Sequence, residues 1–283
     1  MSNISKLRPS PIAGLWYSGE TETLRNQVDR YIQEAKIPPL DGDVMAIIAP
    51  HAGHRYSGKT AGHAFRCVLG SSHDLVAVIS PFHSYTSQPL LTTAHEAYQT
   101  PLGPVWVDKD AANNLNQVLY KESGQKMQPL ADDEEHALEI ELPFLQRAVA
   151  GEFKLLPVMV HTHSEDILKG LGKALASTLA GTTSPLMVAS TDLSHFYPEQ
   201  IANQLDMEML TQIASFSPEG VLNAEKQGTG FACGAGAVAA VLWAAKLLGA
   251  TQVIPLHHST SAEQTGDHSS VVGYGAAAVI KPR

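Results

Sequence analysis

Short apolar runs alternate with amphipathic stretches along most of the chain. The runs are rich in Val, Ile, Leu and Ala without polar alternation, which is typical of strands that are covered on both faces. They predict strands at Asp43–Ala49, Asp74–Ser80, Lys154–Val160, Ser184–Ser190, Thr251–Leu256 and Val271–Ile280. The stretches between them predict helices at Thr21–Ala35, Gly58–Leu69, Ala111–Tyr120, Asp133–Val149, Glu165–Leu179, Glu199–Ala214 and Gly234–Leu248.

This order of elements predicts an α/β fold. Strands that alternate with helices form a largely parallel or mixed central sheet flanked by helices. No linker rich in Pro, Gly or Ser and no change of composition divides the chain, so a single domain is predicted over residues 1–283. The segment Gln88–Val107 contains three prolines and a glycine, and is predicted to be a long excursion or a hairpin at the sheet edge.

The composition limits the classes of partner. The net charge of −9 argues against nucleic acid or an anionic membrane surface, because both require a basic footprint. The apolar stretch Ala235–Ala250 is interrupted by Lys246 and Gly249, so a buried helix is predicted there rather than a membrane span. The two cysteines, Cys67 and Cys233, are too few and too distant for a disulfide framework. A reducing, cytoplasmic location is therefore expected.

Histidines follow the ends of four predicted strands. They are His51, His83, His161 and His195. In open α/β sheets, ligands bind in the crevice outside the carboxyl ends of the strands, which favours a shared site over chance placement. His51 and His83 each lie near a proline that stiffens the chain, and two imidazoles on such turns can converge on one metal ion.

Other polar residues are candidates for the same site, each with an alternative. Cys233 precedes a long apolar helix, whose N-terminus would stabilise a thiolate ligand or nucleophile, but a small core side chain is equally consistent. Asp192 lies three residues before His195 and could make it a general base, or could instead cap a helix. His136 falls in the first turn of a predicted helix, where an exposed histidine is the alternative. The pocket could also be edged by His161, His163, His257 and His258.

Several motifs occur in order along nearly the whole chain: Arg8-Pro9, Ala13–Tyr17, Ala49–Gly53 with Tyr56–Gly58, Glu135–Glu139 running into Leu142–Leu145, Ser190–His195, Cys233-Gly234 with Ala237-Val238, and Val271–Tyr274. Each motif alone is weak, but the ordered set resembles the Memo family. This family is also known as component B of the AmmeMemoRadiSam system and is related in fold to class III extradiol ring-cleavage dioxygenases. Two details depart from the usual pattern: Ala137 replaces a serine, and Ser80-Pro81-Phe82-His83 replaces Gly-Pro-x-His.

The resemblance implies a metal site made by His51, His83 and Cys233, with one ion per chain. Fe(II) is the first expectation, and Cu or Zn are alternatives. The resemblance also implies pocket roles for His136, Asp192 and His195. In an enzyme, His195 paired with Asp192 would act as the acid or base, and His136 would orient the substrate. In the ring-cleaving relatives a glutamate stands where Cys233 stands here. A thiolate is softer and more easily oxidised than a carboxylate, which widens the choice of metal to copper.

Three functions remain open at this point. The first is a non-haem iron or copper oxidoreductase, similar to a dioxygenase and with an unknown substrate. The second is a non-catalytic adaptor that binds a metal or a peptide, with an aromatic rim formed by Trp16, Tyr17, Phe82, Tyr85 and Phe196. The third is a metal-free Cys/His hydrolase, which leaves the paired histidines without a role. The expected partners are a small-molecule or peptide ligand in the cleft and, from the resemblance, a radical SAM protein.

Overall fold

The computed structural model describes residues 5–131 and 133–283. Its centre is a nine-stranded sheet. Eight strands follow one another across it, in the order β10 (His195–Tyr197), β12 (Val271–Lys281), β2 (Asp43–Ala49), β9 (Pro185–Ser190), β3 (Leu75–Pro81), β8 (Lys154–Val160), β4 (Leu90–Thr93) and β7 (Gln128–Leu130). The ninth strand, β11 (Gln252–Thr260), pairs with β12. Strands β2, β9, β3 and β8 run parallel, whereas β12 pairs antiparallel with β2, β10 and β11. The sheet is therefore mixed, as predicted, with a parallel centre.

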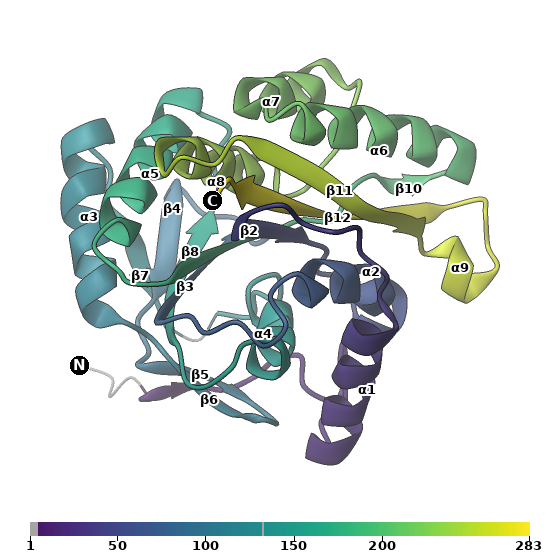
Figure 1. Cartoon of the computed structure of the whole chain (residues 1–283), viewed down its shortest axis with the longest axis horizontal. Coiled ribbons are helices and arrows are strands. Elements are labelled where there is room, and N and C mark those ends of the chain that lie inside the picture. Colours follow the sequence, from purple (N-terminus) through teal and green to yellow (C-terminus); the bar gives the residue numbers. More distant parts are fainter. Residues whose placement is uncertain (1–4, 132) are drawn as a thin grey trace.

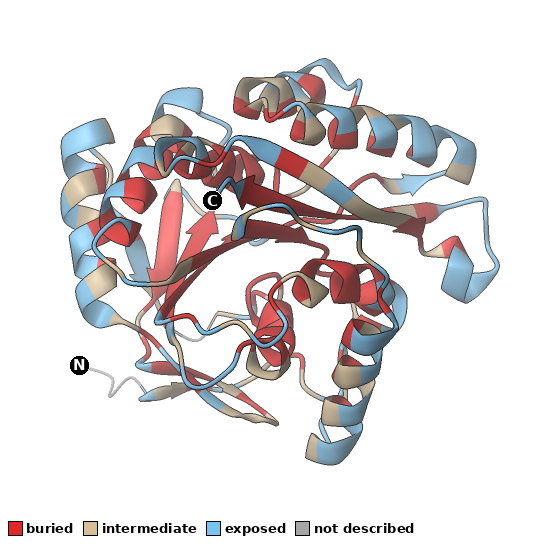
Figure 2. Cartoon of the chain, viewed as in Figure 1, coloured by how far each residue is buried: buried red, intermediate tan, exposed pale blue. Residues whose placement is uncertain are grey.

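Helices cover both faces of this sheet (Figure 1). One face carries α3 (Lys109–Ser123), α5 (Glu165–Leu179), α6 (Glu199–Ala214), α7 (Pro218–Gln227) and α8 (Ala235–Leu247), and the other carries α1 (Thr21–Glu34), α2 (His54–Arg66) and α4 (Leu142–Ala148). A short helix, α9 (Ala262–Thr265), connects β11 to β12. The central strands and the inward sides of the helices are buried (Figure 2). Each face has its own hydrophobic cluster, which explains why the central strands lack polar alternation.

The strand predictions are confirmed to within a few residues at their ends. The predicted hairpin in Gln88–Val107 is also present: β5 (Ala97–Thr100) and β6 (Gly103–Trp106) pair antiparallel. Strand β1 (Leu7–Arg8) joins β5, so these strands form a separate three-stranded sheet. Helices α7 and α9 and strands β1, β4, β7 and β10 have no counterpart among the predicted elements.

The predicted helix at Asp133–Val149 is wrong in its first half. Residues 133–138 are irregular, and a 3-10 turn at Glu139–Glu141 leads into α4. Pro143 explains the late start, because proline is tolerated in the first turn of a helix and not in its middle. His136 therefore lies in a loop and not in the first turn of a helix.

The apolar stretch that begins at Ala235 forms the buried helix α8, as predicted. Ten of its residues, among them Val238, Val241 and Leu242, are buried against the sheet and neighbouring helices. In the described part of the chain, no helix combines the length and apolar character needed to cross a bilayer.

Candidate metal centre

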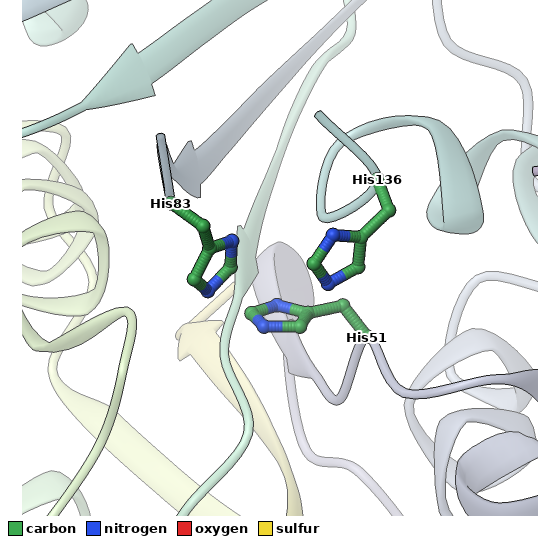
Figure 3. A group of neighbouring side chains, drawn as sticks. All are labelled: His51, His83 and His136. Carbon is green, nitrogen blue, oxygen red and sulfur yellow. The ribbon is translucent and has the colours of Figure 1, made fainter. Parts of the chain in front are cut away.

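The parallel centre of the sheet brings distant histidines to one edge. His51 follows β2 by two residues and His83 follows β3 by two residues, and these strands flank β9. His136 reaches the same place from the loop before α4. The ligand atoms of His51, His83 and His136 all lie within 4.8 Å of one another, and their rings face a common space (Figure 3). Three imidazoles at this spacing could hold a metal ion.

One carboxylate contacts two of these rings. Glu135 Oε1 lies 3.0 Å from Nδ1 of His83 and 3.3 Å from Nδ1 of His136. The same carboxylate accepts hydrogen bonds from the backbone amides of His83 and His136. An ionised carboxylate only accepts, so His83 turns its Nδ1–H toward Glu135 and keeps its Nε2 lone pair free, whereas the contact of His136 with Glu135 is a close approach without a hydrogen bond from the ring.

A serine orients the third ring. His51 Nδ1 lies 3.0 Å from Ser190 Oγ. The other neighbours of this hydroxyl are the Ala137 carbonyl at 2.8 Å and Glu141 Oε1 at 2.6 Å. Ser190 has one proton and the Ala137 carbonyl can only accept, so the hydrogen-bond network assigns the donor role toward Ser190 to His51 Nδ1–H. The Nε2 atoms of His51 and His83 are therefore the atoms that these contacts leave available as ligands.

The electrostatics favour neutral imidazoles at His51 and His136, whereas at His83 burial is outweighed by the hydrogen bond and the charge of Glu135, which raise the pKa above its usual value. Burial lowers the pKa of His51 well below its usual value, and positive charge on His136 or His83 would lower it further. Burial likewise lowers the pKa of His136 to about 4. Burial raises the pKa of Glu135, but its hydrogen bonds with His83 and with backbone amides outweigh this effect and bring it to about 2. A neutral ring is the form that binds a metal, so His51 and His136 need not release a proton at neutral pH.

Cys233 lies next to His51. Its Sγ is 3.1 Å from His51 Nε2 and accepts a hydrogen bond from the Asp192 amide at 3.3 Å. Burial and the Asp192 charge raise the pKa of this thiol well above its usual value, so the expected thiolate-stabilising effect of the helix N-terminus does not dominate. The predicted ligand set and the three-histidine group thus share His51 and His83 and differ in the third donor, Cys233 or His136.

Asp192 and His195 have different neighbours from those expected. Asp192 Oδ1 accepts hydrogen bonds from the backbone amides of His51 at 2.8 Å and Ala52 at 3.3 Å, and burial raises the pKa of this carboxyl to about 7. His195 donates Nδ1–H to the Leu193 carbonyl at 2.7 Å, which leaves its Nε2 free. Burial lowers the pKa of His195, and the carboxylate that opposes this effect is Asp206 on α6. Asp192 therefore supports the backbone of His51.

Part of the predicted aromatic rim is exposed beside the site. Trp16 packs on His136 with ring centroids 4.1 Å apart, and Phe196 lies against His195. The exposed fractions of Trp16, Tyr85 and Phe196 are 38%, 95% and 74%. Tyr17 and Phe82 are buried, so their assignment to the rim is wrong; Tyr17 is held inside by a hydrogen bond to Glu139.

The remaining histidines do not join the three-histidine group in the described chain. His257 stacks on His63, and His258 pairs with Asp206; both lie within β11. His161 contacts the carbonyl of Phe82, and His163 pairs with Glu225.

Three residues that shape the site were not singled out from the sequence. Glu135 and Ser190 orient imidazoles, and each is the first residue of a motif recognised in the sequence, although the motif alone assigned it no role. Arg8 is buried in the N-terminal segment, where its guanidinium contacts Asp133 Oδ1 and the Glu135 carbonyl, each at 2.7 Å. Arg8 thereby holds the loop that carries His136.

Comparisons with known proteins show to which family the chain belongs. A family model described as "Memo-like protein" matches residues 8–278. The chain belongs to the Memo family. Similar Memo proteins include a "MEMO1 family protein" from Nitrosopumilus maritimus, which is 32% identical over 95% of this chain and 98% of that protein. Others are a protein from Methanosarcina mazei at 29% identity over 96% and 98%, and one from Aquifex aeolicus at 30% over 95% and 97%.

Membership of the Memo family supports the predicted fold class, an α/β fold like that of the extradiol dioxygenases. In this Memo protein the alanine at position 137 leaves the ring network intact, because Ser190 uses the backbone carbonyl of Ala137 and not its side chain.

Proposed function

We propose that this Memo protein binds one metal ion per chain at His51 and His83, and that it is an oxidoreductase acting on a small molecule or peptide that is not yet identified. Fe(II) is the first expectation, with Cu or Zn as alternatives. The observation that carries the proposal is the convergence of three imidazoles, two of which, His51 and His83, have their Nδ1 atoms held by hydrogen bonds to Ser190 and Glu135. This arrangement leaves the Nε2 lone pairs of His51 and His83 for one ion.

The third ligand divides the proposal into two forms. With Cys233 as the ligand, the exposed edge of His136 is free to orient a substrate against Trp16. With His136 as the ligand, the thiol of Cys233 stays beside His51 Nε2. A bound iron or copper ion would supply Lewis acidity and one-electron redox chemistry. His195 would exchange a proton with the substrate through its free Nε2 in either form.

Anaerobic Fe(II) titration of single variants tests the ligand set. We expect His51→Ala and His83→Ala to lose binding. The third ligand is the residue, Cys233 or His136, whose replacement by alanine causes the larger loss of affinity. The sequence resemblance predicts Cys233. His163→Ala is the control, because His163 is exposed and pairs with Glu225 away from the group. Wild-type affinity in the His51→Ala and His83→Ala variants would refute the site.

Turnover requires a separate measurement. Oxygen uptake by the iron-loaded protein with a panel of catechols would reveal oxidoreductase activity. His195→Ala is expected to lose that activity while it keeps its metal, because His195 lies outside the three-histidine group. Equal uptake by wild type and His195→Ala would remove His195 from the reaction.

The adaptor is the second candidate, and the exposed aromatic rim favours it. Leu15 is 80% exposed near Trp16 and adds to this apolar surface, and exposed apolar patches often mark binding sites. An adaptor would retain metal and bind a peptide without turnover. We also propose that the protein is cytoplasmic and has a radical SAM protein as its partner. Co-purification of the two proteins from cytoplasm would test both.

The metal-free hydrolase has the weakest support. A nucleophilic cysteine requires a lowered pKa, whereas burial and Asp192 raise the pKa of Cys233. We therefore expect slow alkylation of Cys233 at neutral pH in the metal-free protein; rapid alkylation with activity that resists chelators would favour the hydrolase.

A further inference from the structure

A buried carboxylate lies behind the segment that carries His195. Asp206 is in the middle of α6, and its side chain has no exposed surface. Its Oδ1 accepts a hydrogen bond from the backbone amide of Ser194 at 2.9 Å, and its Oδ2 lies 2.8 Å from His258 Nε2. A buried carboxylate is unfavourable unless donors satisfy it, and Asp206 finds them on two other elements of the fold.

The neighbouring chain leaves room for this carboxylate. A Cβ atom at Gly273 would lie 1.9 Å from Asp206 Oδ2, so only glycine permits the observed approach. Gly273 is also tied to the same segment, because its amide donates to the Ser194 carbonyl and its carbonyl accepts from the Leu193 amide, both at 2.8 Å. The Val271–Tyr274 motif thus encloses the Asp206 contact.

The backbone beyond Ser194 is strained and requires support. Phe196 has φ of 66°, in the left-handed region, and it interrupts the pairing of His195 and Tyr197 with β12. Such a conformation persists only where the surrounding structure holds it. Strand β12 holds the segment after His195, and Asp206 holds it before His195, at Ser194.

Asp206 contacts the backbone amide of Ser194 and not its hydroxyl. Ser194 Oγ is buried and has no hydrogen-bond partner among the described residues. Asp206 also supplies the carboxylate charge that raises the pKa of His195 against the effect of burial.

We propose that Asp206 is a positioning residue of the metal centre. Through the Ser194 amide, and held in turn by His258, it fixes residues 192–195. It thereby sets the direction of the His195 ring and the place of Asp192 beneath the His51 backbone. The role of His195 rests on the proposed function, whereas the hold of Asp206 on this segment does not.

The test compares Asp206→Asn with two controls in the metal-free protein. The controls are Glu208→Gln, the same change of acid to amide on α6, and Ser194→Ala, which keeps the backbone amide. NMR would record the chemical shifts of the amide proton of residue 194 and of the ring of His195 in each protein. In Asp206→Asn we expect the amide proton to move upfield and the ring signals to shift, because a neutral acceptor replaces a charged one. Glu208→Gln should retain wild-type values at both positions, and Ser194→Ala should retain the His195 ring signals.

A second readout uses the loaded protein. Asp206→Asn is expected to lower oxygen uptake about tenfold or more while metal affinity falls less, as for residues that orient a site from outside. If the wild-type protein binds no metal, the proposed function fails. The NMR comparison still decides whether Asp206 positions residues 192–195. Unchanged Ser194 and His195 signals in folded Asp206→Asn would overturn it, as would a loss of stability alone. Should Asp206→Asn not fold, His258→Ala removes one of the two donors to Asp206 and is read in the same way.

Discussion

The charge of Glu135 provides the sharpest test of how the imidazoles are arranged. Glu135→Gln keeps the size of the side chain but removes the carboxylate that faces Nδ1 of both His83 and His136. The amide group of the glutamine donates, so one of its two ends must face N–H groups that also donate.

The expected loss of stability in Glu135→Gln can be worked out in two ways. The pKa of Glu135 lies at about 2 against an ordinary value of 4.5, and a difference of about 2.5 units corresponds to about 3 kcal/mol in favour of the charged form. Removing one partner of a buried charged pair costs about 3–5 kcal/mol in general. Both routes describe the same contacts and are not added. We therefore expect a loss of about 3 kcal/mol in the free energy of unfolding and about 10- to 100-fold in metal affinity.

The assay is urea unfolding of the metal-free protein, followed by a metal competition titration. Glu134→Gln is the matched control, because Glu134 is adjacent and exposed. If Glu135→Gln matches this control in both measurements, Glu135 does not orient the histidines.

Three further predictions concern the surroundings of the site. Ser190→Ala removes the acceptor for His51 Nδ1–H, so metal affinity should fall about tenfold in a competition titration; an unchanged affinity would show that His51 needs no such partner. Arg8→Lys loses the planar fork that spans Asp133 and the Glu135 carbonyl, and urea unfolding should show a loss of about 3 kcal/mol; wild-type stability would contradict this. Burial lowers the pKa of His54 to about 4. Below about pH 6.5, His54 therefore takes up a proton in the unfolded protein but not in the folded protein. The free energy of unfolding should fall by about 3 kcal/mol as the pH drops from about 6.5 to 4. Urea unfolding across this range should show a shallower decline in His54→Gln, and an identical decline would exclude His54 as its source.

The sequence predicts the centre of the fold well because local pattern and tertiary environment agree there. Strands such as Lys154–Val160 are apolar throughout because helices cover both faces of the sheet. The rule that ligands bind at the carboxyl ends of strands also predicted that His51 and His83 lie close together. Where a local pattern is overridden, prediction failed: the acidic and apolar residues at 133–149 suit a helix, but Arg8 and Pro143 keep its first half irregular.

The residues that orient the site are harder to predict because their partners are distant in sequence. Ser190 meets Glu141 across 49 residues and Glu135 meets His83 across 52. Asp206 stands in the middle of an amphipathic helix, where an acidic residue is usually solvated, and only the fold shows that it is buried against Ser194. No periodicity in the sequence encodes such contacts.

The central claim is that His51 and His83 hold one metal ion, and elemental analysis by mass spectrometry tests it most directly. The measurement compares anaerobically purified wild type with His51→Ala and His83→Ala. We predict iron or copper near one per chain in wild type and none in either variant. Absence of metal in wild type after anaerobic reconstitution, or equal metal in all three proteins, would contradict the claim.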